Sequence, residues 1–262
     1  MCLIAVAWKV HPRFPLALIA NRDEAHARPT AAAGFDTRHP DVYGGRDLAQ
    51  GGGWLMASTR GRLAAVTNVR TGPAPPDAPR SRGGLVRAFV ADGEVAAMPW
   101  LASLMSTAPT YGPFNLLAWD GEALGFASNH PTPAFEAVAP GTHAMSNGAF
   151  DAAWPKSTHA TRALDAWLAS SLAEGAVNHA AIAPLLDALA DTAVAPDAAL
   201  PDTGVGLALE RALSPPFVLG RDYGTRCSTV VLVEGSAITF VERRFGPEGV
   251  VLGESYERLP RP

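Results

Sequence analysis

The sequence predicts a mixed α+β fold in which two antiparallel β-sheets pack between two layers of helices, a four-layer αββα sandwich. Two observations lead to this prediction. Both ends of the chain consist of short apolar runs of strand length, and the middle carries apolar residues at helical spacing. A chain of 262 residues, 48% of them hydrophobic and 18% charged, can bury a sizeable core. We therefore expect one domain over residues 1–262.

The N-terminal part predicts two hairpins separated by an irregular segment. Residues 2–8 and 15–20 are adjacent apolar runs of strand length. Residues 51–57 and 62–68 form a second such pair across a short turn that contains glycine. Residues 25–50, between the two pairs, are polar and rich in turn residues, so we expect irregular structure there.

A proline-rich segment, two helices and a third hairpin follow. Residues 71–82 contain four prolines, which is incompatible with a central strand or helix and predicts an exposed loop. Residues 85–92 and 95–105 have helical patterns. Residues 114–119 and 123–127 flank an Asp-Gly pair, and such a pair between apolar runs is a strong hairpin signal.

The last part of the chain predicts helices followed by strands. A short strand is expected at residues 142–145, and residues 158–172 and 180–189 carry an apolar face at helical spacing. Residues 193–216 are rich in proline and alanine and predict a connection. The C-terminal strands are expected at residues 228–233, 238–243 and 250–256.

Composition and missing motifs exclude several classes of protein. A net charge of −4 argues against nucleic-acid binding. The sequence has no Gly-x-Ser-x-Gly, P-loop or dinucleotide motif, and its seven histidines form no metal-binding pair. No run approaches the roughly 20 apolar residues of a transmembrane helix, and the N-terminus does not resemble a signal peptide. We expect a soluble, cytoplasmic protein without a metal site or a required cofactor.

Cys2 and Cys227 are the two cysteines, too few for a disulfide framework, although a single bridge between them stays open. Cys2 is the strongest candidate for a nucleophile. If Met1 is removed, Cys2 carries a free α-amine, and an amine with a pKa near neutrality can act as the base for the thiol. The alternative is a small buried residue that begins a strand.

Four polar residues, Asn21 to Glu24, directly follow the second apolar run. Side chains alternate across a strand, so either Asn21 with Asp23 or Arg22 with Glu24 faces a pocket. The alternative is an ion pair of Arg22 with Asp23 or Glu24 that closes a turn.

Further short motifs follow in a characteristic order: Gly52-Gly53-Trp54, Thr59-Arg60-Gly61, Thr67-Asn68, Ser81-Arg82-Gly83, Phe114-Asn115-Leu116, Ser146-Asn147 and Tyr223-Gly224-Thr225-Arg226. Together with Met1-Cys2 and the Asn-Arg-Asp-Glu cluster, they resemble the NRDE family over roughly residues 1–245. This is the family of the transport-and-Golgi-organisation protein of animals and its bacterial relatives. The resemblance implies the fold of the N-terminal nucleophile hydrolases, with choloylglycine-type amidases as distant relatives.

The resemblance also implies roles for individual residues. In the choloylglycine-type relatives an arginine, and an aspartate three residues later, flank the nucleophile. Aligned by spacing, Asn21 and Glu24 occupy these positions; aligned by residue type, Arg22 and Asp23 do. Asn68 and Asn147 resemble asparagines that bind the oxyanion and the amine, although Asn147 before glycine also suits a left-handed turn.

Arg226 resembles a late arginine of the same class. The predicted catalytic residues are Cys2, Arg22, Asp23, Asn147 and Arg226, and the predicted ligand-binding residues are Asn21, Glu24 and Asn68. We expect three further arginines on the solvated surface, with contact to an anionic ligand as the alternative: Arg60, Arg70 and Arg82.

The function implied is the binding or mobilisation of a hydrophobic anionic small molecule such as haem, an acyl-CoA or a lipid. The alternative is a cysteine amidohydrolase that cleaves a non-peptide C–N bond with Cys2.

Overall fold

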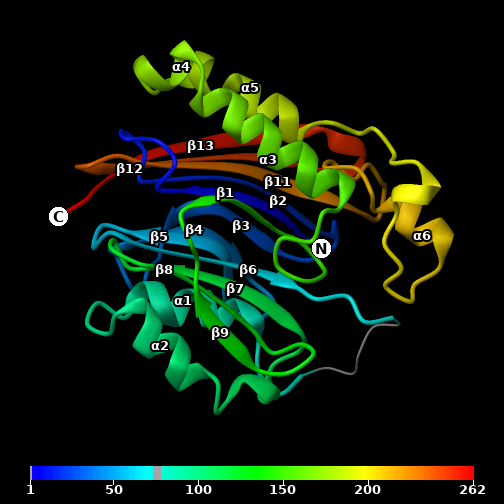
Figure 1. Ribbon diagram of the computed structural model, residues 1–262, viewed down its shortest axis with the longest axis horizontal. Helices are drawn as coiled ribbons and strands as arrows, with labels where there is room; N and C mark the ends of the chain where they lie inside the picture. Colours follow the sequence, from blue (N-terminus) through cyan, green and yellow to red (C-terminus); the bar gives the residue numbers. More distant parts are fainter. Residues whose placement is uncertain (1, 73–77) are drawn as a thin grey trace.

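The computed structural model describes residues 2–72 and 78–262, and Figure 1 shows four layers: helices, sheet, sheet and helices. Every strand pairs antiparallel with its neighbours in the sheet. The αββα sandwich predicted from the sequence is therefore confirmed. The predicted proline-rich loop lies partly outside the described residues, because residues 73–77 are not among them.

Each sheet has a continuous strand order. The six-stranded sheet runs in the order β10 (Gly141–Met145), β1 (Cys2–Trp8), β2 (Leu16–Ala25), β11 (Tyr223–Val233), β12 (Ala237–Phe245) and β13 (Val251–Pro260). The seven-stranded sheet follows chain order: β3 (Thr30–Phe35), β4 (Val42–Asp47), β5 (Gly53–Ser58), β6 (Arg62–Asn68), β7 (Phe114–Trp119), β8 (Leu124–Ser128) and β9 (Ala134–Ala137).

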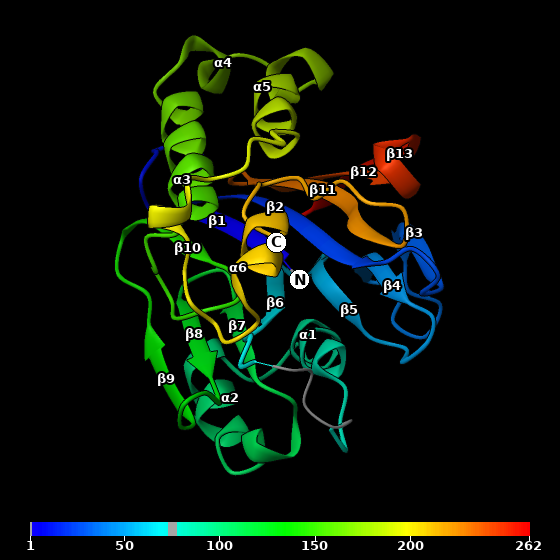
Figure 2. The ribbon, with the colours of Figure 1, turned by 90° about the vertical axis from the view of Figure 1, so that its right-hand side faces the viewer.

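The helices cover the outer faces of the sheets, as Figures 1 and 2 show. Those on the six-stranded sheet are α3 (Pro155–Leu168), α4 (Ser171–Glu174) and α5 (His179–Leu189). Those on the seven-stranded sheet are α1 (Arg82–Ala91) and α2 (Ala97–Leu104). The short α6 (Leu207–Ala212) belongs to the connection from α5 to β11, and three 3₁₀ turns lie at Ala108–Thr110, Asp197–Ala199 and Pro247–Gly249.

Three apolar clusters hold the layers together. Trp119 and Phe240 are buried between the two sheets, Trp167 of α3 is buried in the helix-side core of the six-stranded sheet, and Phe89 of α1 is buried in that of the seven-stranded sheet. Side chains of β1 alternate between the inter-sheet core and the helix-side core, so the strand is apolar on both faces. Burial of each such large side chain contributes roughly 1.5–3 kcal/mol, which explains why the central strands are continuous apolar runs.

The predicted hairpin at the Asp-Gly pair is confirmed. Gly121 has a φ of +102°, a conformation that favours glycine. Asp120 Oδ1 accepts the backbone N–H groups of Glu122 and Ala123 and closes the turn between β7 and β8. Helix α3 begins at Pro155, three residues before the predicted start, as expected for proline in the first turn of a helix.

One expectation was wrong. Residues 25–50 are not irregular, because they contain β3 and β4. The glycines that suggested turns are needed for close packing of these strands: a Cβ at Gly44 would lie 2.6 Å from the Leu55 carbonyl oxygen, and one at Gly45 would overlap the Trp54 ring. Residues 193–216 are the expected connection, and the short helix α6 lies within it.

No helix within residues 2–72 and 78–262 has the length and apolar character needed to cross a membrane.

Candidate functional site

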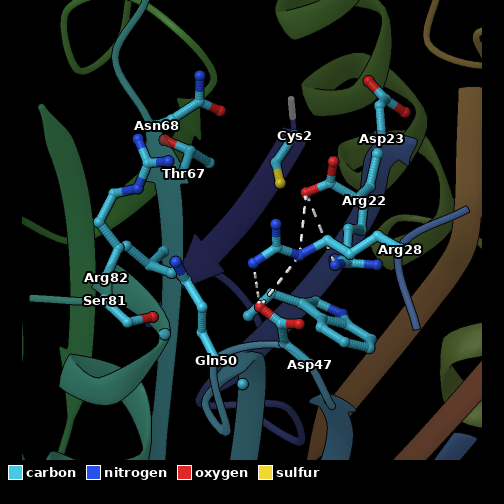
Figure 3. Close-up of a pocket in the computed structure, with 15 residues that line it drawn as sticks. Cys2, Arg22, Asp23, Arg28, Asp47, Gln50, Thr67, Asn68, Ser81 and Arg82 are labelled. Atoms are coloured by element: carbon cyan, nitrogen blue, oxygen red, sulfur yellow. Dashed lines mark hydrogen bonds and ion pairs between the residues drawn. The ribbon is translucent and has the colours of Figure 1, made fainter. Parts of the chain in front are cut away.

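A cleft of about 100 Å³ opens between the two sheets beside the first residue of β1 (Figure 3). Five of the eight site residues predicted from the sequence line it. They come from the start of β1, the last part of β2 and the end of β6: Cys2, Arg22, Asp23, Glu24 and Asn68. The other lining residues are Arg28, Asp47, Gln50, Gly53, Trp54, Val66, Thr67, Ser81, Arg82 and Gly83.

Cys2 begins β1 and pairs with Arg22 of β2. Its thiol is partly exposed to the cleft, and its backbone carbonyl accepts a hydrogen bond from Ser146 Oγ (2.9 Å). Burial raises the pKa of the Cys2 thiol, while Arg22 and a hydrogen bond from the backbone of Asp23 act in the opposite direction. The thiol therefore needs a base to become a nucleophile at neutral pH.

Arg22 is buried against an aromatic ring. Its guanidinium carbon lies 4.3 Å from the centre of the Trp54 ring, an arrangement that stabilises a cation. One guanidinium nitrogen donates to Thr30 Oγ1 (3.3 Å), and the other lies 3.8 Å from the Glu24 carboxylate. Arg22 consequently presents positive charge to the cleft without a short ion pair.

A short ion-pair chain forms the lower wall of the cleft in Figure 3. Arg28 lies 2.6 Å from Asp47 and 3.8 Å from Glu24. Hydrogen bonding to Asp47 raises the pKa of Arg28. The pKa of Asp47 is lowered because the hydrogen bonds from Arg28 and from the Ala49 N–H outweigh its burial. These two charges largely satisfy each other.

The structure decides which residues of the Asn-Arg-Asp-Glu cluster face the cleft. The cluster lies within β2, not beyond the strand, and the side chains of Arg22 and Glu24 project to the inter-sheet side. Asn21 projects to the helix side and is structural: its Nδ2 donates to Leu189 O (2.7 Å) and Pro216 O (2.8 Å). Asp23 lines the cleft beside Cys2, but its carboxylate is turned toward the helix side, where Thr225 Oγ1 donates to its Oδ1 (2.7 Å).

Lys156, to which the sequence analysis gave no role, lies near Asp23. It is 3% exposed, sits in the first turn of α3 and donates to the carbonyl oxygen of Leu213 (3.2 Å). Burial lowers the pKa of Lys156 to about 8, and the Asp23 charge opposes this effect. Burial likewise raises the pKa of Asp23, and Lys156 opposes that shift. The two groups thus support each other's charged forms beside Cys2.

Two asparagines form a pair on the opposite side of the cleft. Asn147 is fully buried, and its Nδ2 donates to the backbone oxygen (2.8 Å) and to Oδ1 (3.1 Å) of Asn68. The left-handed turn considered for Asn147 is wrong, since Asn147 is not among the positive-φ residues of the described chain. Asn147 positions Asn68, whose Nδ2 is then the donor available to a ligand.

Arg82 was expected on the surface, and this expectation was wrong. It begins α1, lines the cleft and donates to Pro113 O (3.1 Å). Burial lowers its pKa, and Cys2 and Glu24 are close enough to act on it. Arg70 is also buried, in an ion pair with Glu210 (3.0 Å).

A signal for Arg82 existed in the sequence. Gly83 follows it, and a Cβ on Gly52 would lie 2.3 Å from the Gly83 carbonyl carbon. This close approach brings the first turn of α1 to the cleft.

Arg226 is not in this cleft. The pairing of β2 with β11 shifts between Thr225 and Cys227, so Arg226 is the extra residue of a β-bulge, which redirects its side chain. Its guanidinium donates to the carbonyl oxygens of Ala25 (2.8 Å) and Arg28 (3.1 Å), and it lines a second cavity.

Comparisons with known proteins identify the family of this chain. The family model described as Transport and Golgi organisation 2 matches residues 1–247. The human Transport and Golgi organization protein 2 homolog is 32% identical over 93% of this chain and 92% of its own length. The mouse homolog is 30% identical over the same shares.

The structure resembles the C2A mutant of conjugated bile acid hydrolase from Clostridium perfringens. The TM-score is 0.50 at 7% sequence identity, over 92% of this chain and 88% of that chain. This likeness confirms the predicted fold, that of the N-terminal nucleophile hydrolases.

Proposed function

Because this chain belongs to the Transport and Golgi organisation 2 family, and because its cleft is built around Cys2, we propose that the protein is a hydrolase with Cys2 as its nucleophile. The bond cleaved is a non-peptide C–N bond of a small anionic substrate. The observation that carries the proposal is the position of the Cys2 thiol, at the first residue of β1 and partly exposed to a cleft lined by arginines. The fold shared with a conjugated bile acid hydrolase supports it.

The base is the α-amine that Cys2 gains when Met1 is removed. In the antiparallel pairing Cys2 lies opposite Arg22, so its backbone nitrogen is at the end of β1 nearest Asp23. The Asp23 carboxylate can stabilise the ammonium that forms when this amine takes the thiol proton, and the Lys156 charge opposes the rise that burial causes in the pKa of Asp23. The amine takes the thiol proton, a role that typically contributes 10²–10⁴-fold to the rate.

Acylation of Cys2 and hydrolysis of the acyl-enzyme then follow. The Cys2 sulfur bonds to the substrate carbonyl carbon, and the negative charge develops on the carbonyl oxygen. Asn68 Nδ2 is the candidate donor to this oxyanion, an interaction worth roughly 10²–10³-fold when lost. The α-ammonium returns the proton to the leaving nitrogen as the C–N bond breaks, and water hydrolyses the resulting thioester and frees the thiol.

The arginines suit an anionic substrate. Arg28 is paired with Asp47, whereas Arg82 has no ion pair within 4 Å among residues 2–72 and 78–262. Arg82 is therefore the candidate to bind a substrate carboxylate or similar anion.

The test combines mass spectrometry with turnover. Intact mass shows whether Met1 is absent, and brief alkylation at neutral pH followed by peptide mapping shows whether Cys2 reacts ahead of Cys227. A panel of N-acyl amides with anionic head groups is then assayed with wild type, Cys2→Ala and Cys2→Ser. Loss of turnover in Cys2→Ala supports the proposal. Retention of Met1, or equal turnover in Cys2→Ala, contradicts it.

A second candidate is a carrier for a hydrophobic anionic ligand such as haem or an acyl-CoA. The arginines that line the cleft favour it, because they would attract an anionic group of the ligand. Haem titration followed by visible absorbance separates the two functions. An acyl-CoA or haem that binds equally well to Cys2→Ala and is not turned over supports the carrier.

A further inference from the structure

A second cavity of about 140 Å³ lies beside the Cys2 cleft, and Arg22 and Trp54 line both. The stacked pair of these side chains therefore forms the wall between the two spaces. The second cavity is lined by residues of β2, β3, β5, β11, β12 and β13: Arg22, Thr30, Ala32, Trp54, Arg226, Cys227, Glu242, Arg244, Phe245 and Leu252.

Glu242 brings an unsatisfied carboxyl oxygen to this cavity. The residue is 1% exposed, and its Oε1 accepts the backbone N–H of Ala33 (2.8 Å). Oε2 has no hydrogen-bond partner in the part of the chain that the structure describes. Burial raises the pKa of Glu242, which favours its neutral form. An unpartnered buried polar atom costs about 1–3 kcal/mol, a cost that a bound ligand would relieve.

The cavity also has excess positive charge. Arg226 donates to backbone carbonyl oxygens and Arg244 donates to Ser255 Oγ (2.8 Å). Neither arginine forms an ion pair within 4 Å with any carboxylate of the described residues. The pKa of Arg226 is lowered by burial and by the neighbouring charge of Arg22. An anion placed among these guanidinium groups would relieve their repulsion.

The remaining wall is apolar and leads to solvent. Phe245 is buried, whereas Leu252 is 63% exposed and lies where the cavity reaches the surface. The site thus combines a charged, hydrogen-bonding inner end with an apolar outer end, a combination typical of ligand pockets.

We propose that this cavity binds a short-chain aliphatic carboxylate. The carboxylate would lie among Glu242, Arg226 and Arg244, and the chain would pack against Phe245 and Leu252. The carboxylate and the first carbons of the ligand would occupy the cavity of about 140 Å³, and longer chains would extend over Leu252. The proposal concerns a second site, and it does not depend on hydrolysis at Cys2.

The experiment is calorimetric titration of the full chain with butyrate, butyramide and inorganic phosphate. We expect saturable 1:1 binding of butyrate, and binding of butyramide at least about ten-fold weaker because it lacks the charge. Absence of saturable butyrate binding overturns the proposal. Phosphate binding as tight as butyrate binding overturns the assigned ligand class.

Variants then locate the site. Arg244→Met and Glu242→Leu should weaken butyrate binding at least about ten-fold, whereas Glu242→Gln retains a donor and should bind within about three-fold of wild type. Arg258→Met, a more exposed arginine on β13, is the matched control and should bind like wild type. Equal binding by Arg244→Met overturns the assignment.

A measurement on wild type covers the case in which these variants do not fold. Butyrate should shift the backbone amide NMR signals of Ala33 and Cys227, and leave those of the α2 surface unchanged. Shifts confined to other regions contradict the site.

Discussion

Cys2 and Cys227 lie two strands apart on the same face of the six-stranded sheet, with Arg22 between them as the register partner of both. Neighbouring strands are about 4.8 Å apart, so the two Cα atoms are separated by about 10 Å, beyond the 4.4–6.8 Å that a disulfide requires. Both cysteines are free. The bridge that the sequence left open therefore does not form.

The two thiols should differ strongly in reactivity. Cys227 is 2% exposed and burial raises its pKa well above the usual value, whereas the Cys2 thiol opens on the cleft. We expect iodoacetamide to label only Cys2 in the native protein, and both cysteines in urea. Peptide mapping by mass spectrometry measures this, and native labelling of Cys227 at a rate comparable to Cys2 would contradict the assigned burial.

Replacing Arg22 should affect both the thiol and the fold. Arg22 lowers the pKa of the Cys2 thiol, so Arg22→Met should shift the pH dependence of Cys2 alkylation upward. Arg22→Lys keeps the charge but stacks less well on Trp54, and should lower the free energy of unfolding by roughly 0.5–1 kcal/mol.

Alkylation rates between pH 6 and 10, with urea unfolding of each variant, test both effects. Arg60→Met, a half-exposed arginine paired with Asp41, is the control and should leave the alkylation profile unchanged. A profile of Arg22→Met identical to wild type would show that Arg22 does not act on the thiol.

Lys156 should make stability depend on pH in the alkaline range. Its pKa falls from 10.5 to about 8 on folding, so between these values the unfolded chain binds more protons. The free energy of unfolding should therefore rise from about pH 8 to about pH 10.5, by up to about 3 kcal/mol at 1.36 kcal/mol per pKa unit. Below pH 8 the full cost of burying the charge remains.

Lys156→Met should remove this rise, because no titrating group remains at that position. Lys9→Met, which removes the exposed lysine on the turn after β1, is the control and should retain it. Urea unfolding at pH 7, 8, 9 and 10 gives the profiles, and subtraction removes contributions that all variants share. An unchanged rise in Lys156→Met would assign the effect to other groups.

Asn147 should affect turnover at Cys2 only by holding Asn68 in position. Asn147→Ala leaves two oxygens of Asn68 without their donor and should cost about 1–3 kcal/mol of stability. Asn178→Ala removes the N-cap of α5 and should cost about 1 kcal/mol.

The two variants form a matched pair, because both lose stability and only one acts at the cleft. Turnover of an amide substrate should fall in Asn147→Ala and stay near the wild-type value in Asn178→Ala. An equal fall in both would indicate that stability alone, and not the position of Asn68, controls turnover.

Much of the fold was predictable because its signals are local. Runs with apolar residues on both faces, such as β1, belong to strands covered on both sides, and the Asp120-Gly121 turn fixes its hairpin. Strands β3 and β4 escaped prediction because the glycines that allow them to pack beside Trp54 are the residues that usually indicate turns.

The sequence by itself determined that Cys2 begins a strand and that Arg22 and Glu24 share one face of the next. Only the tertiary structure decided which face that is. Alternation allows either Arg22 with Glu24 or Asn21 with Asp23 to face the other sheet, and the pairing of β2 with β1 and β11 selects the first arrangement. It also turned Arg226 away through a β-bulge and brought Lys156 beside Asp23. Such placements depend on packing between distant segments, which local sequence patterns do not encode.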